Sequence, residues 1–310
     1  MDIVALFYDL DNYATQFSQH FSQCHKPSAL PAGKRRSGPR RYRHHHRPNR
    51  KGTMHISEVM ILLILFHAKN YRTFKHFYLE HVHVHMRGEF PNLVSYNRLI
   101  ELVPKALAVL IGFLNVRKAD CSGISFIDST SLRVCHNMRI NSHKVMAGIA
   151  QRGKTSTGWF FGFKLHLTTN DKGELLDVCM TPGNIDDRVP VDQLTKKLWG
   201  KLFGDRGYIS QPLFEKLFGR GLQLITRLKS KMKNRLIPLF DKLLLRKRAI
   251  IETIIDQLKN IMQIEHSRHR GVPHYFADIL AGLIAYTYQE KLPSLNLATQ
   301  QQKMLGGYAI

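Results

Sequence analysis

The feature that most constrains the fold is a change in the spacing of apolar residues near position 119. Residues 55–116 carry apolar side chains at helical spacing, whereas residues 159–168 alternate apolar and polar positions as strands do. Strands are predicted at 124–134, 159–168, 174–180, 202–205 and 222–227, and helices at 187–198, 211–218, 243–266 and 273–290. Hairpin-linked strands followed by crossovers predict an α/β fold, a mixed five-stranded sheet flanked by helices.

The first half of the chain predicts an all-α N-terminal region. Ser57 and Ser95 are predicted N-caps of two helices, and Pro104 is predicted to open another. Several short helices beside a basic segment fit a helix-turn-helix-like DNA-binding module. They fit a plain helical bundle equally well, and no signature in the sequence separates the two.

Positive charge dominates the composition. Lys and Arg number 46 against 23 Asp and Glu, a formal net charge of +23. Such an excess predicts a polyanionic partner, with nucleic acid first and an anionic membrane surface second. Residues 31–51 hold nine Lys or Arg and no acid, so this segment is predicted to be a basic arm without a core of its own. Three consecutive histidines, His44, His45 and His46, favour a solvated or phosphate-facing tract over a metal site.

The cysteines and the apolar runs indicate in which cellular compartment the protein is expected. The four cysteines form no Cys-x-x-Cys pair and no zinc spacing, which is typical of reduced thiols in the cytosol. The first residues lack a signal-peptide pattern. The longest apolar run, residues 59–66, is too short to cross a bilayer. We therefore expect a cytoplasmic protein with no membrane partner.

These patterns divide the chain into five predicted parts. They are an N-terminal helical segment (1–30), the basic arm or linker (31–51), the helical DNA-binding domain (52–118), the α/β domain (119–292) and a C-terminal tail (293–310).

Three acids lie in or beside short apolar runs, where a carboxylate is costly unless its charge is compensated. They are Asp128 in Ile-Asp-Ser-Thr, Asp205 in Gly-Asp-Arg-Gly-Tyr, and Glu252 in Arg-Ala-Ile-Ile-Glu. Converging acids are usually compensated by a divalent metal. Two Mg²⁺ ions about 3.5–4 Å apart promote in-line attack on a phosphodiester, and two or three carboxylates suffice to hold them.

The predicted elements bring these acids together. Asp128 falls in the middle of the first strand and Asp205 at the end of the fourth, where Gly204 and Gly207 are expected to let the backbone turn away. Glu252 lies on the predicted helix 243–266. Arg248 and Lys259 fall on the same helical stripe as Glu252, within roughly 40°. A carboxylate flanked by two cations suits a site for metal and phosphate.

The acids also have ordinary explanations. Asp128 suits a turn before Ser129, Asp205 suits an Asx-turn, and Glu252 suits a helix-surface pair with Arg248.

These residues resemble the bacterial insertion-sequence transposases of the DDE superfamily, over roughly residues 120–290. The resemblance rests on Asp128-Ser-Thr, on Gly204-Asp-Arg-Gly-Tyr208, and on Arg248-x3-Glu252-x6-Lys259, which matches the Tyr-x2-Arg-x3-Glu-x6-Lys signature. The segment from Thr181 to Asp187 also resembles the one that follows the third strand in the family. One departure is that the signature Tyr falls on Leu245.

The resemblance implies a ribonuclease-H-like catalytic domain. It implies that Asp128, Asp205 and Glu252 bind Mg²⁺, with Mn²⁺ able to substitute, for strand cleavage and strand transfer. The implied partners are double-stranded DNA, as element ends and target, and a second copy of the chain, at the bacterial nucleoid. The residues expected to contact DNA are Arg248, Lys259, Arg206, Lys247, Arg35, Arg36, Arg40 and Arg41.

Two rival interpretations remain at this point. One is a non-catalytic DNA-binding remnant, which composition does not exclude. The other is a single-strand endonuclease with His-hydrophobic-His metal ligands and a tyrosine nucleophile, because His81-Val-His-Val-His85 fits that pattern and Tyr71, Tyr78 and Tyr96 lie nearby. That site would need the histidines on a strand, where alternate side chains share one side.

Overall fold

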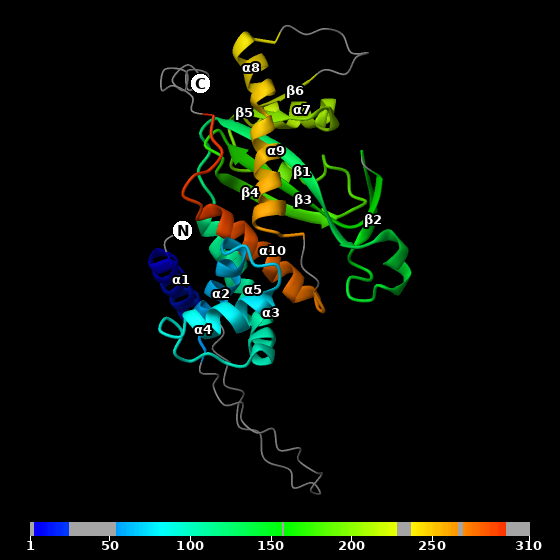
Figure 1. The fold of residues 1–310 in the computed structure, drawn as a ribbon. Coiled ribbons are helices and arrows are strands. Elements are labelled where there is room, and N and C mark those ends of the chain that lie inside the picture. The colour runs from blue at the N-terminus through cyan, green and yellow to red at the C-terminus, as the bar shows by residue number, and fades with distance from the viewer. Residues whose placement is uncertain (1–2, 25–53, 157, 228–236, 266–268, 296–310) are drawn as a thin grey trace, which may run out of the picture.

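The computed structural model describes residues 3–24, 54–156, 158–227, 237–265 and 269–295. Figure 1 shows a sheet with helices on both faces and a group of N-terminal helices packed beside it. The whole of the predicted basic arm, with Arg35, Arg36, Arg40 and Arg41, lies outside the described residues.

The described N-terminal residues are helical, as predicted. The segments are α1 (Ile3–Cys24), α2 (Ile56–Ala68), α3 (Phe74–His76), the π-helix η1 (Phe77–Val82), α4 (His83–His85) and α5 (Tyr96–Arg117). Ser95 caps α5, as predicted, by accepting a hydrogen bond from the Arg98 amide. The N-cap of α2 is His55 and not Ser57, whose hydroxyl instead donates to Asp11 of α1 at 2.8 Å.

The prediction that Pro104 opens a helix is wrong, because Pro104 lies inside α5. A proline inside a helix leaves the carbonyl four residues earlier without its usual amide partner. Here that carbonyl belongs to Ile100, and the His274 ring of α10 contacts it at 2.9 Å. A side chain from another helix therefore replaces the missing bond, and α5 continues through the proline.

The sheet has six strands in the described residues, not the predicted five. They are β1 (Ile124–Cys135), β2 (Gln151–Thr155), β3 (Gly158–Asn170), β4 (Leu175–Pro182), β5 (Gly200–Gly204) and β6 (Leu222–Thr226). The strand that sequence reasoning missed is β2, whose residues Gln-Arg-Gly-Lys-Thr include no apolar side chain to signal a strand. Its backbone pairs with the first residues of β3.

The strand order is β2-β3-β1-β5-β6, with β4 also paired to β3. One edge of β3 pairs antiparallel with β1, while the other edge is divided between β2 and β4. β1, β5 and β6 run parallel. The sheet is therefore mixed, as predicted, and β1 lies at its centre beside β5.

Helices cover both faces of the sheet. After β1 comes the 3-10 helix η2 (Asn137–Ser142), and the later elements are α6 (Val191–Leu194), the 3-10 helix η3 (Arg206–Tyr208), α7 (Gln211–Phe218), α8 (Leu239–Lys247), α9 (Ala249–Asp256), the π-helix η4 (Gln257–Ile261) and α10 (Val272–Thr287). The helix predicted at 187–198 is only the single turn α6, for which Pro190 is the N-cap.

The helix predicted at 243–266 differs from the observed one in bounds and form. It begins earlier, and α8, α9 and η4 follow one another as a rod across the sheet (Figure 1). The Met262 amide donates to the Gln257 carbonyl at 2.9 Å, five residues back, which is the π-helical bond. Gln263 then adopts a left-handed φ of 52°, which ends the rod.

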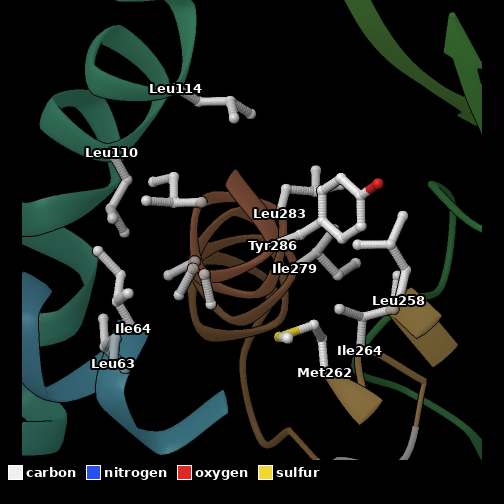
Figure 2. Packing of buried hydrophobic residues seen from close by; sticks show 14 of the residues in the cluster. Leu63, Ile64, Leu110, Leu114, Leu258, Met262, Ile264, Ile279, Leu283 and Tyr286 are labelled. Atoms are coloured by element: carbon white, nitrogen blue, oxygen red, sulfur yellow. The ribbon is translucent and has the colours of Figure 1, made fainter. Parts of the chain in front are cut away.

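Two clusters of apolar side chains hold these layers together. The small core lies between the sheet and α6 and α7, and contains Ile127, Leu176, Val191, Leu194, Leu198, Leu202, Tyr208, Leu217, Leu222 and Leu224. The large core lies on the opposite face and continues into the N-terminal helices without interruption. In Figure 2, α10 lies between two groups of labelled side chains: Leu63, Ile64, Leu110 and Leu114 on one side, and Leu258, Met262 and Ile264 on the other.

A polar joint connects α2 to the end of the rod. The His67 Nδ1 contacts the Met262 carbonyl at 2.5 Å, and its Nε2 lies 3.4 Å from Asp278 Oδ1 on α10. Gln263 donates to Asn70 at 3.0 Å, and both residues have left-handed φ values at helix ends. We call these five residues the joint.

By length and composition, α5 is the one helix of the described residues that could cross a membrane. Its buried side chains, from Leu99 to Leu114, belong to the large core, where the helix packs against α10 and α2.

Candidate active site

Asp128 lies in the middle of β1, as predicted, on the face of the sheet that α9 covers. Side chains alternate along a strand, so Asp128 shares its face with Phe126 and Leu132 of the large core. Its partner across the ladder, Leu167, belongs to the same core. The Asp128 side chain is 20% exposed, and its Oδ1 accepts a hydrogen bond from the Ser129 amide at 2.8 Å.

Asp205 comes directly after β5, the parallel neighbour of β1. Phe203 is in register with Phe126, so Asp205 and Asp128 each lie two residues beyond a registered pair. Neighbouring parallel strands therefore carry the two acids toward the same place, an arrangement that the predicted strand order allowed. Asp205 is exposed to solvent.

Gly204 has a role in this turn that differs from the predicted one. Neither Gly204 nor Gly207 has a left-handed φ, so neither is needed for backbone freedom. A Cβ on Gly204 would lie 3.1 Å from the Tyr208 ring and 3.2 Å from Ile127, whereas one on Gly207 would meet nothing within 4 Å. Gly204 thus lets Tyr208 pack close beneath the strand end.

Arg248 connects the acids of the sheet and the rod. It lies between α8 and α9, with its side chain 13% exposed, and its Nη1 is 2.8 Å from Asp128 Oδ2. Its Nη2 also donates to Glu252 Oε1, one turn later on α9. Glu252 is 57% exposed. The guanidinium therefore lies between two of the three predicted metal ligands.

The electrostatics of Asp128 indicate a shortage of positive charge. Burial raises the pKa of Asp128 above its ordinary value, and the Arg248 guanidinium and the Ser129 amide offset this only in part. The charge of Asp205 raises the pKa of Asp128 further, so the two carboxylates lie close enough to repel each other. A second cation at this place would relieve both effects.

The donor atoms here suit a hard divalent cation, because they are carboxylate oxygens. In the described residues, however, no three Asp, Glu, His or Cys side chains converge as a metal-binding group. The reason at this site is that Arg248 holds Asp128 and Glu252 as its own partners. The residues present fit the metal by chemistry and charge, with Arg248 between them.

Lys259 lies farther along the rod and has protein partners. Its Nζ donates to the Ser131 carbonyl of β1 at 2.7 Å and lies 2.9 Å from Glu265 Oε2. The other Glu265 oxygen accepts from the Arg133 amide at 3.0 Å. Lys259 and Glu265 therefore fasten the rod to β1 beyond Asp128.

The other predicted DNA contacts in the described residues are exposed. Arg206 directly follows Asp205, and Lys247 directly precedes Arg248. Leu245, at the position of the signature Tyr, is 5% exposed within the large core. The departure from the signature therefore falls on a packing position.

Sequence reasoning missed a polar cluster on the opposite face of β1. His166 is fully buried beside Ser129 in the ladder, and its Nε2 contacts the Thr181 hydroxyl at 2.8 Å. Burial lowers the pKa of His166 to about 4, although Asp187 opposes this effect. Lys164 pairs with Asp187 at 2.9 Å.

Tyr208 completes this cluster. Burial raises the pKa of the Tyr208 hydroxyl, and the nearby charges of Asp128 and Asp187 raise it further. The motifs around Asp187 and Tyr208 were noted in the sequence, but only the strand register shows that they meet beneath Asp128.

The histidines of the rival endonuclease interpretation lie in helix, not strand. His81 is in η1, while His83 and His85 form part of α4. The His81 ring stacks on Phe77 and lies 5.6 Å from the His85 ring, one turn away. Alternate histidines on one side of a strand, which that interpretation required, are therefore not present in these residues.

One of three comparisons with known proteins gives a match. The family described as "Transposase DDE domain" matches residues 118–272, half of the 310-residue chain. No curated protein and no solved structure matches the chain. The matched stretch contains the whole sheet and the rod, with Asp128, Asp205, Arg248 and Glu252. The chain therefore belongs to the family of transposases that carry a DDE domain.

Proposed function

We propose that this protein cleaves the ends of an insertion element and joins them to target DNA, with Asp128, Asp205 and Glu252 as its catalytic acids. The observation that carries the proposal is the arrangement around Arg248, which pairs with Asp128 and Glu252 while Asp205 raises the pKa of Asp128. Two acids from neighbouring strands and one from the rod thus surround a single cation.

In this proposal the three carboxylates hold divalent metal, as the family generally does, with Mg²⁺ preferred and Mn²⁺ able to substitute. When bound there, such a metal would supply a lowered pKa for an attacking water or 3′-hydroxyl and stabilisation of the leaving oxygen. Arg248 exchanges its carboxylate partners for a DNA phosphate, which a guanidinium binds through two parallel hydrogen bonds. Glu252, 57% exposed, would then be free of its Arg248 partner and available as a metal ligand.

The exposed cations beside the acids bind the DNA backbone in this proposal. Arg206 and Lys247 flank Asp205 and Arg248 in the sequence and are open to solvent. Lys259 supports the site indirectly, because its Nζ donates to the Ser131 carbonyl and so holds the rod against β1. Arg35, Arg36, Arg40 and Arg41, outside the described residues, add phosphate contacts, consistent with the net charge of +23. The protein works as a dimer or larger assembly on double-stranded DNA in the cytoplasm, at the nucleoid.

Cleavage of a supercoiled plasmid that carries candidate element ends, with and without Mg²⁺, tests the proposal. The parent protein is expected to nick or cut at the ends only with the metal, and Asp205→Asn is expected to lose this activity while still binding the DNA. Asp256→Asn is the matched control, since Asp256 is an exposed acid on α9 that accepts from Asn260. It is expected to cleave like the parent.

The same assay separates the proposal from a DNA-binding remnant. A remnant binds the ends and cuts none of them under any metal condition. If Asp205→Asn cleaves as fast as the parent, the assignment of the acids is wrong. A denaturing gel adds a further check, because the proposed site leaves no protein covalently attached to DNA.

A further inference from the structure

Between Asp128 and Asp171 the chain contains no acid. Residues 129–170 hold six Lys or Arg and no Asp or Glu. This stretch includes the end of β1, η2, β2 and β3. Figure 1 shows β2 and the segment before it extending to one side of the sheet, away from the N-terminal helices. We call residues 136–156 and 158–162 the lateral arm.

The lateral arm exposes a large aromatic side chain. Trp159, at the start of β3, is 59% exposed. The Lys154 Nζ lies 5.8 Å from the centre of its ring, and Asn137 of η2 donates to the Trp159 carbonyl at 2.8 Å. η2 also exposes Met138 and Arg139. The Trp159 backbone is thus anchored to η2, while its indole ring is left open to solvent and offers a flat surface to another flat group.

The strand register places Trp159 on the same face of the sheet as Asp128. Asp128 pairs with Leu167 of β3, and Trp159 precedes Leu167 by eight residues, an even number. Side chains alternate along a strand, so Trp159 shares the face of Leu167 and Asp128. Eight residues at about 3.3 Å each place Trp159 roughly 26 Å along β3 from Leu167, the partner of Asp128. That length corresponds to roughly eight nucleotides of one DNA strand at about 3.4 Å each.

Two unpaired cations accompany the indole on that face. Lys154 pairs with Trp159 across the ladder, and Arg152 pairs with Phe161. Both cations are exposed, and within the described part of the chain no carboxylate forms an ion pair with either. Elsewhere in these residues, cations such as Lys201 and Lys216 do have acidic partners.

We propose that the lateral arm binds single-stranded or unstacked DNA on the same face of the sheet as Asp128 but away from the acids, with one base stacked on Trp159 and the backbone paired with Arg152 and Lys154. An exposed aromatic ring among cations is the combination that binds single strands without sequence preference. The inference rests on the proposed function for its substrate, since cleavage creates a free DNA end on this face of the sheet.

The two tryptophans of the chain allow a direct test, because Trp199→Phe leaves Trp159 as the sole indole. This variant is titrated with a short single-stranded oligonucleotide in EDTA, so that no cleavage occurs. Stacking predicts quenching of the Trp159 fluorescence, with the same dissociation constant as the anisotropy of a labelled oligonucleotide. Bound DNA that leaves the fluorescence unchanged would overturn the proposal.

Substitution of the ring gives a second readout. Trp159→Ala is expected to weaken single-strand binding roughly 5- to 150-fold, the loss that one base–aromatic stack accounts for. Trp159→Phe keeps a ring and is expected to bind within about threefold of the parent. Binding of a blunt duplex, which offers phosphates but no unstacked base, is expected to change little in either variant. Equal single-strand affinity of the parent and Trp159→Ala would contradict the inference.

The contribution of Arg152 and Lys154 is tested by the salt dependence of single-strand binding. The double variant Arg152→Gln/Lys154→Gln is expected to lower the slope of log affinity against log salt by about 1.4 for a single strand. Lys172→Gln/Lys197→Gln removes the same charge from exposed positions outside the lateral arm and is expected to leave the slope unchanged. Equal slopes in the two double variants would count against the lateral arm. Cleavage by the parent and Asp205→Asn reports on the proposed function separately, because these titrations need no catalysis.

Discussion

Asp278 is a buried carboxylate and Asp128 a partly buried one, with side chains 7% and 20% exposed. Asp278 lies in the joint between two histidines, His67 and His269, each 3.4 Å from one of its oxygens. Burial alone would raise the pKa of Asp278, but His67 and His269 hold it well below the ordinary value. At Asp128 burial prevails, and the pKa is raised despite Arg248.

We propose that this difference separates a structural carboxylate, Asp278, from a functional one, Asp128. In the joint, side chains of the protein supply the positive charge that Asp278 needs. Around Arg248, one guanidinium faces three acids, so the site keeps an excess of negative charge. A structure that leaves this charge uncompensated fits a cation that arrives from solution.

Removing the structural carboxylate is expected to have the largest effect. Asp278→Ala leaves the buried His67 and the partly buried His269 without their counter-ion, and the loss of one partner from a buried pair costs about 3–5 kcal/mol of unfolding free energy. Urea denaturation measures this loss. Asp256→Ala, on the exposed side of α9, is the control and is expected to stay within about 0.5 kcal/mol of the parent.

The contrast between Asp278 and Asp128 fails if replacing Asp128 also destabilises the protein. Because folding disfavours the charged form of Asp128, Asp128→Asn is expected to be no less stable than the parent at neutral pH. A loss comparable to that of Asp278→Ala would show that Asp128 is fully compensated, and the distinction between the two sites would fail.

A smaller effect, on metal affinity, is expected when the Arg248 guanidinium is removed. Arg248→Gln takes away a positive charge that competes with metal for Asp128 and Glu252. We expect this variant to bind Mn²⁺ more tightly than the parent by about 1–2 kcal/mol, roughly 5- to 30-fold. Calorimetry or electron paramagnetic resonance without DNA measures the affinity. Lys247→Gln removes the neighbouring charge as a control and is expected to bind Mn²⁺ like the parent.

The smallest effect is a pH dependence that belongs to the joint. Burial alone would lower the pKa of His67, but Asp278 raises it above the ordinary value of 6.5. A raised histidine pKa contributes stability that is present below pH 6.5 and is lost as the pH rises through the folded value. The lowered pKa of Asp278 contributes stability above its ordinary value of 3.8, which is lost as the pH falls. The pair therefore contributes fully between these two pH values.

Urea unfolding at pH 5.5 and pH 8.5 tests this window. The parent is expected to lose more stability than His67→Gln on going to the higher pH, because only the parent loses the ionised pair. Equal losses in the two proteins would remove the joint as the source of the dependence. Asp128→Asn serves as a comparison that keeps the joint intact.

The sheet was largely predictable from the sequence, because apolar alternation identified every strand with a buried face. The strand β2 escaped prediction because its five residues are polar or glycine and it is defined only by backbone pairing with β3. The predicted strand order allowed the strands of Asp128 and Asp205 to lie side by side, and the register of β1 and β5 confirms that they do.

The environment of the site was less predictable. The stripe of Arg248, Glu252 and Lys259 assumed a regular helix, whereas η4 adds a wider π-helical turn before Lys259 meets Ser131. Arg248 was expected to contact DNA, and the sequence alone did not indicate that it pairs with both Asp128 and Glu252. The joint links residues roughly 200 positions apart, such as His67 and Met262, which no local pattern reveals.

The hydrogen bond between Gln263 and Asn70 helps fasten the rod, and with it one of the three proposed catalytic acids, to the N-terminal helices. Asp128 lies on β1 and Asp205 directly follows β5, and the hydrogen bonds between these two strands set the spacing of the two residues. Glu252 is on the rod, about 15 Å along a regular helix from the joint at Met262. The sheet therefore positions two of the proposed acids, whereas the third lies on an element that is anchored through the joint.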